Sequence, residues 1–264
     1  MQRIKAKIDL KKNAQRNADD YYTRSKRLLQ KAEGAKKAVK DLEAKLLKLE
    51  SQAGAVEHTG GRVKIQKKEW FEAFHWFYTS GGLLVVGGRD ATQNELLNSR
   101  HFDEGDLFFH ADVFGASVTI MKGGKDSKIQ ERYEAAQFAA SYSSAWKGGI
   151  SSVDVYAMRR EQVGKSSGGG YLSKGSFSLS GEREWYRAIP LALVAFAKDE
   201  KFCVIPKIKF DVMDKEQRTN YASISMGRDK KSEAAKALGK ITGCQDIDYI
   251  MQQLPAGGFR ITKA

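Results

Sequence analysis

Hydrophobic and small residues recur at alternating intervals of four and three over the first fifth of the chain. The segment from Asp9 to about Gln52 has no proline and one glycine, and it is rich in Ala, Lys, Leu and Glu, which favour helix. This spacing predicts a long coiled-coil helix with Asp9 as its N-cap, and two intervals of three beside Gly34 predict a stammer, a local overwinding. The predicted seam positions are Ala18, Tyr22, Ser25, Leu29, Ala32, Ala35, Val39, Leu42, Leu46, Leu49 and Ala53.

A seam of this kind has to bury its stripe against another helix. No other part of the sequence supplies a second long heptad helix. The sequence therefore predicts a partner from elsewhere, either a second copy in a homodimer or the first arm of a helical hairpin.

Small residues and glycines interrupt the helical pattern over Ser51–Gly61, and a different texture follows. The predicted organisation is a coiled-coil arm at 1–53, a linker at 54–61 and a domain at 62–264. In that domain, short runs rich in β-branched and aromatic residues alternate with glycines, which predicts an α+β fold with a mixed, mainly antiparallel sheet and flanking helices. The predicted strands are HWFYTS, LLVVGG, DLFFHADV, SVTIMK, SVDVYAM, GYLSKGSFSLSG, ALVAFAK, FCVIPKI and YASISM, and the predicted helices lie at about 91–99, 127–146, 231–241 and 246–253.

A glycine pair between two of these strands and a proline in another carry finer predictions. Gly81-Gly82, between the first two runs, predicts a two-residue hairpin because glycine accepts positive φ at low cost. Pro206 predicts that FCVIPKI lies at an edge or an end of its sheet, since proline cannot donate to a central ladder.

Charge changes this picture from a generic α+β protein to one with a polyanionic partner. The formal net charge is +13, and residues 1–50 hold fifteen Lys or Arg and seven Asp or Glu, a net +8. A concentrated positive field favours phosphate chains, since neutralised phosphates release condensed counterions. The alternative is a solvated, charged helix face.

The number of cysteines and the hydropathy of the chain bear on the cellular compartment of the protein. Cys203 and Cys244 have no further pair nearby, so the sequence predicts two buried small hydrophobes and neither a disulfide framework nor a cysteine-rich zinc site. No signal peptide opens the chain and no apolar run approaches the roughly 20 residues needed to cross a bilayer. We therefore expect a cytoplasmic protein.

The string GGRDATQNE follows a predicted strand and opens a predicted helix at Asp90. Backbone amides at such a helix start can receive a phosphate, with Arg89 beside them and Asn94 one turn on. The alternative is that the glycines only turn the chain while Asp90 caps the helix and pairs with Arg89. The string lacks the GKS or GKT ending of a Walker loop.

His110 and Asp112 lie two apart in HADVFGAS, which on a strand puts them on one face. An acid/base pair or two metal ligands would fit that spacing, but no other His has companion spacing for a third ligand. We expect a hydrogen-bonded structural pair, with contact of His110 to an RNA backbone as the next interpretation.

A glycine-rich stretch from 159 to 187 combines basic side chains with aromatic ones. Such a surface suits nucleotides that stack and phosphates that are held. The alternative is a solvated hairpin whose aromatics face the core, and the alternation in SFSLSG points Phe177 and Leu179 inward together. The candidate RNA contacts here are the basic residues Lys165, Lys174, Arg183 and Arg187.

No serine lies in a GxSxG elbow and neither cysteine adjoins a His, so nucleophilic catalysis has no candidate. We expect a non-catalytic protein without a cofactor or metal. An RNA-modifying or RNA-processing enzyme using His110, Asp112 and Asp90 is the alternative, and an oligomerising scaffold is a third.

Four blocks, in order and in register over roughly residues 61 to 190, resemble the NFACT-R domain of the NFACT family of ribosome quality-control factors. They are WFEAFHWFYTSGGLLVVGGRDATQNELL, EGDLFFHADVFGAS, AAQFAASYSSAWKGG and REQVGKSSGGGYLSKGSFSLSG. The helix, with NAQRNADDYYTRSKRLLQKAEGAKKAV, is similar to the second arm of that family's coiled coil.

The resemblance implies a factor that binds large ribosomal subunits obstructed by peptidyl-tRNA, recruits tRNA and supports C-terminal tailing of the stalled chain. Its partners would be tRNA and the rRNA of the large subunit. The family's N-terminal domain, helix-hairpin-helix region and first arm have no counterpart here, so we expect a fragment that binds RNA without sustaining tailing, or a reduced relative. Two local departures are VFGAS, where the family commonly has a second His before the Gly, and GEREWY in place of a lysine run.

Overall fold

A computed structural model describes residues 8–53, 69–164, 166–167, 170–171, 175–198 and 201–263. The chain divides into two compact units, residues 1–66 and 67–264, which are treated separately below. The predicted linker at 54–61 lies outside the described residues.

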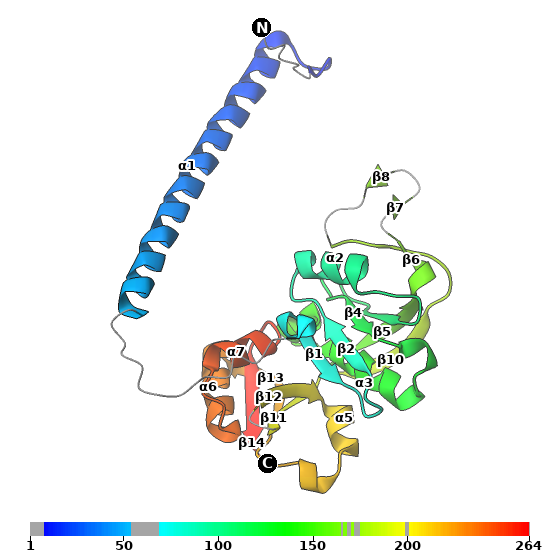
Figure 1. The fold of residues 1–264 in the computed structure, drawn as a ribbon. Helices are drawn as coiled ribbons and strands as arrows, with labels where there is room; N and C mark the ends of the chain where they lie inside the picture. Colours follow the sequence, from blue (N-terminus) through cyan, green and yellow to red (C-terminus); the bar gives the residue numbers. More distant parts are fainter. Residues whose placement is uncertain are drawn as a thin grey trace. The chain divides into compact units, whose positions relative to one another are not determined.

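Within its described residues, the first unit contains one helix, α1 (Ala14–Ala53), which runs through Gly34 without a break (Figure 1). Its first turn is capped by Asn13, whose Oδ1 accepts from the Arg16 amide at 2.9 Å. The prediction of Asp9 as N-cap is wrong, because Asp9 lies in the turn before the helix and accepts from the Lys11 amide. On the predicted seam, the side chains of Tyr22, Leu29 and Val39 are exposed.

The second unit confirms the α+β prediction, with two main antiparallel sheets and flanking helices. Its larger sheet has six strands in the order β1-β2-β4-β3-β5-β10 (Figure 1). These strands are β1 (His75–Tyr78), β2 (Leu84–Gly87), β3 (Leu107–Ala111), β4 (Thr119–Met121), β5 (Ser152–Arg159) and β10 (Glu184–Pro190).

Alternate residues of the six-stranded sheet face two hydrophobic clusters, as the period of two requires. Val85 and Phe109 belong to the larger cluster, whereas their neighbours Val86 and Phe108 belong to the smaller one. The helix α2 (Ala91–Arg100) packs on the smaller cluster through Leu97. Both faces of this sheet are therefore covered.

The smaller sheet has four strands in the order β12-β11-β13-β14, with α6 (Lys231–Thr242) and α7 (Ile247–Gln253) beside it (Figure 1). The edge position of β12, which ends at Pro206, confirms the prediction from that proline. The strands are β11 (Leu193–Lys198), β12 (Lys201–Pro206), β13 (Ala222–Asp229) and β14 (Phe259–Lys263).

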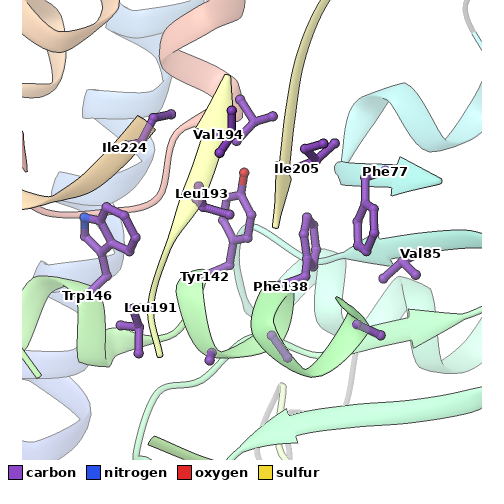
Figure 2. Packing of buried hydrophobic residues seen from close by; sticks show 14 of the residues in the cluster. Phe77, Val85, Phe138, Tyr142, Trp146, Leu191, Leu193, Val194, Ile205 and Ile224 are labelled. Carbon is purple, nitrogen blue, oxygen red and sulfur yellow. The ribbon is translucent and has the colours of Figure 1, made fainter. Parts of the chain in front are cut away.

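Helix α3 (Ile129–Ser141) joins the two sheets, because it packs against β3, β5 and β10 of one and β12 of the other. Its residue Phe138 is fully buried between Phe77 and Tyr142, with ring centroids 4.9 and 4.5 Å away (Figure 2). Residues of both sheets therefore share one core around this helix.

Short elements complete the described part of the unit. Two small ribbons pair β6 (Val163–Gly164) with β9 (Ser178–Leu179), and β7 (Ser166–Ser167) with β8 (Gly170–Tyr171). The other short elements are α4 (Ser144–Gly148), α5 (Lys207–Val212), η1 (Trp70–Ala73), η2 (Gly124–Asp126), η3 (Arg160–Gln162) and η4 (Lys215–Gln217).

Local chemistry explains where the sequence predictions failed. The turn between β1 and β2 is a five-residue loop, Thr79–Leu83, and of its two glycines Gly82 alone has positive φ, +87°. A Cβ at Gly81 would lie 2.2 Å from Oε1 of Glu131, so that glycine serves a close approach. The helix predicted at 127–146 is two helices, because the Ser143 hydroxyl caps α4 by accepting from the Ala145 amide.

Neither cysteine forms a disulfide within the described residues, and both are partly rather than fully buried against the larger cluster. No helix among the described residues is long and apolar enough to cross a membrane.

Candidate nucleic-acid interface

A groove of about 680 Å³ runs beside the start of α2, and we call it the α2 groove. Strands β2 and β3 both pair antiparallel with β4, so they run parallel to each other. Their C-terminal ends therefore lie at the same end of the sheet. The segments that follow these two strands meet there with β5 and with the residues that precede β9. The groove is lined by Arg89, Asp90, Ala91, Asn94, Phe108, His110, Val113, Phe114, Gly115, Ala116, Ser117, Tyr156, Gly175, Ser176, Phe177 and Leu179.

The base of the groove is aromatic and uncharged. His110 of β3 is directly opposite Tyr156 of β5, and its Nδ1 lies 3.2 Å from the tyrosine hydroxyl. Burial lowers the pKa of His110 and raises the pKa of Tyr156, so both are neutral near pH 7. The Phe177 ring meets Phe108 edge on, and Phe177 and Leu179 are partly buried against the smaller cluster, as the alternation predicted.

The wall made by α2 is already hydrogen bonded. The Asp90 carboxylate caps the helix by accepting from the amides of Thr92 (2.7 Å) and Gln93 (2.9 Å). Asn94 is buried and accepts from the Val118 amide. A phosphate at the first amides of α2 would have to compete with the Asp90 carboxylate for them. The structure therefore agrees with the alternative interpretation of GGRDATQNE, in which Asp90 caps the helix.

Arg89 does not pair with Asp90. Its guanidinium donates to the Phe74 carbonyl at 3.0 Å and to the Gln252 side chain at 3.5 Å. Burial lowers the pKa of Arg89, but the group remains a cation at neutral pH.

One side of the groove carries an exposed aromatic ring. Phe114 is fully exposed, although its carbonyl is held by the Ser144 hydroxyl at 2.6 Å and Gly115 follows with φ +78°. An ordered backbone that presents a bare phenyl ring beside a groove is suited to stacking against a flat ligand.

Two arginines stand over the aromatic strand pair β5 and β10. The Arg183 guanidinium lies 4.5 Å from the Tyr156 ring centre, and that of Arg187 lies 4.1 Å from the Trp185 ring centre. Arg187 also pairs with Asp154 at 2.5 Å, whereas Arg183 has no carboxylate partner among the described residues. Cations and rings thus alternate next to the groove.

The structure brings most of the predicted site residues to one place. Arg89, Asp90, Asn94 and His110 line the α2 groove, and Arg183 and Arg187 lie on or just before the adjoining β10. Lys165 and Lys174 are outside the described residues.

Two details of the sequence interpretation change. The expected hydrogen bond between His110 and Asp112 is wrong, because β3 ends at Ala111 and His110 bonds to Tyr156 instead. The sequence interpretation also passed over Phe114 and Tyr156, although VFGAS and the strand SVDVYAM contain them. Within the described parts of the chain, no group of three or more His, Cys, Asp or Glu residues is arranged to hold a metal.

The cap at Asp90 gives a first prediction. Asp90→Ala should lower the free energy of unfolding by about 1 kcal/mol, because two amides lose their acceptor. Asp90→Asn removes the charge but keeps an acceptor, so urea titration should find it close to the parent chain. An equal loss for both variants would contradict the capping role.

Comparison with known proteins shows which family the chain belongs to. The family described as the NFACT protein RNA binding domain matches residues 73–181. The archaeal Rqc2 homolog aRqcH of Methanocaldococcus jannaschii is 34% identical over 212 residues, covering 76% of this chain and 31% of that protein. The chain belongs to the NFACT family. The NFACT match contains every residue that lines the α2 groove.

A second curated relative also supports membership of this family. The ribosome quality control complex subunit NEMF homolog of Drosophila melanogaster is 33% identical over 193 residues, covering 70% of this chain and 19% of that protein. A solved structure of the C-terminal of the fibronectin/fibrinogen-binding protein from Streptococcus suis covers 53% of this chain and 52% of its own, with 23% identity and a TM-score of 0.39. This NFACT chain spans a third or less of the two curated relatives described.

Proposed function

We propose that this chain is a non-catalytic RNA-binding module of a cytoplasmic ribosome quality-control factor. Its ligands are tRNA and the rRNA of the large subunit. The larger task is to engage obstructed large subunits that hold peptidyl-tRNA and to support C-terminal tailing of the stalled chain. The family's RNA binding domain and the names of the relatives support this proposal.

The observation that carries the proposal is the composition of the α2 groove and its surroundings. A single-stranded nucleic acid offers flat bases and a chain of phosphates, and it is bound where rings alternate with cations. The groove supplies the exposed Phe114 for a base and Arg89 for a phosphate, and Arg183 stands beside the groove over the buried Tyr156 ring. His110 faces a tyrosine rather than a carboxylate, which supports a binding role over general acid/base chemistry.

In this proposal the basic helix α1 provides a second set of contacts. Its net positive charge favours rRNA as a second contact, and its exposed stripe favours a second helix, from a returning arm or from another copy.

Filter binding to tRNA tests the proposal, over a range from about 50 to about 300 mM salt. The logarithm of the association constant should fall linearly with the logarithm of the salt concentration, by about 0.9 for each phosphate neutralised. Arg183→Gln should reduce this slope by about one, whereas Arg228→Gln, an exposed arginine of β13, should leave it unchanged. Absent or salt-independent binding would rule the proposal out.

A further inference from the structure

A second pocket, of about 500 Å³, is lined by residues of α7 and of the start of α6, and we call it the α6-α7 pocket. Arg89 lines both spaces. Much of this pocket comes from a part of the chain beyond the family match at 73–181. Its lining consists of His75, Arg89, Lys231, Asp248, Met251, Gln252, Leu254 and Ala256.

Two residues that line the pocket have buried polar atoms without a hydrogen-bond partner in the described structure. The His75 side chain is almost completely buried, with its ring stacked on Tyr142 at 4.1 Å, and its Nδ1 has no partner. The Nε of Arg89 is also buried and unpartnered. Such groups cost free energy unless something bonds to them.

Two cations meet in the same pocket without a counter-ion. Within the described residues, neither Arg89 nor Lys231 forms an ion pair with a carboxylate, although Asp248 also lines the space. The Lys231 ammonium donates to the Leu254 carbonyl at 2.8 Å, which fixes its position. Burial and then the charge of Arg89 lower the pKa of Lys231, so the two cations repel each other there.

His75 experiences the same field. Burial lowers the pKa of His75 furthest, and the charges of Arg89 and Lys231 lower it more, so the ring is neutral at pH 7. An anion between these three groups would relieve the repulsion. A metal cation would add to the repulsion instead.

A phosphate group fits this combination of groups. The planar guanidinium of Arg89 matches the oxygens of a phosphate, and Lys231 supplies a point charge beside it. The remaining wall, made by Met251, Leu254 and Ala256, is apolar and suits the sugar carbons next to a phosphate. A free phosphate would leave that wall bare, whereas an RNA chain would cover it.

We propose that the α6-α7 pocket binds one backbone phosphate of the RNA whose bases occupy the α2 groove, with Arg89 as the shared contact. This inference rests on the proposed function and extends the RNA-binding surface to the C-terminal part of the domain. Arg89 also supports the fold through Phe74, so Lys231 is the residue to change.

The test uses the full chain, with tRNA and inorganic phosphate as separate probes. Lys231→Gln should weaken tRNA binding about 10-fold and lower the salt slope by about one, as expected for one charged contact. Lys231→Arg should restore most of the affinity. Lys236→Gln removes the same charge from an exposed position of the same helix and should match the parent.

The outcomes separate this inference from the proposed function. If the parent chain binds tRNA and Lys231→Gln binds as well as Lys236→Gln, the pocket is not an RNA contact and the proposal is overturned. If millimolar inorganic phosphate raises the melting temperature of the parent but not of Lys231→Gln, while tRNA affinity is equal, the pocket is a free phosphate site and the proposal again fails. If the parent binds no tRNA, the proposed function itself is wrong.

Discussion

Replacing Phe114 by alanine should weaken tRNA binding by about 1–3 kcal/mol, roughly 5- to 150-fold, and leave the stability of the domain unchanged. The affinity should fall because the exposed ring offers a stacking surface at the edge of the α2 groove. The stability should not fall because the side chain is fully exposed and buries nothing in the core. Parallel filter binding and urea titration would measure the two effects.

Two control variants make this result specific. Phe114→Trp keeps a flat ring and should bind at least as tightly as the parent, since stacking tolerates any aromatic face. Val212→Ala shortens an exposed hydrophobic side chain of α5 and should change neither measurement. Equal affinity for Phe114→Ala and the parent would remove the phenyl ring from the interface.

The sequence identified two strings that line the groove, but the strand order of the sheet is what brings them together. Arg89 follows β2 and His110 lies near the end of β3, and β4 lies between those two strands and pairs with both. The antiparallel pairing therefore brings the two ends together. This convergence depends on the strand order, which hydrophobic alternation alone does not specify.

Side-chain partners were harder to predict than strands. His110 and Asp112 have the right spacing for a pair, but the strand ends between them and Tyr156 of β5 occupies the position opposite His110. Phe114 gave no periodic signal, since it lies in a turn, and its importance comes from its exposure. Strand β10 was missed because a bulge at Ala188, with φ +50°, interrupts its alternation.

Replacing Phe138 by alanine should lower the free energy of unfolding by about 3–5 kcal/mol, since it opens a cavity between Phe77 and Tyr142. Domains of this kind have about 5–15 kcal/mol in total, so the loss is a large part of their stability. Urea titration would measure it, with Ile129→Ala, an exposed position of the same helix, expected within about 0.5 kcal/mol of the parent. If Phe138→Ala does not fold, Phe138→Leu should give a smaller loss of the same sign.

Hydrogen exchange on the same variants would show what Phe138 holds together. Because α3 packs against strands of both sheets, the domain should open as one cooperative unit. The slowest amides of β5 in the six-stranded sheet and β11 in the four-stranded sheet should lose equal protection in Phe138→Ala. Loss confined to the six-stranded sheet would mean that the sheets open separately. The groove and the α6-α7 pocket, which share Arg89, would then rest on two independently stable halves.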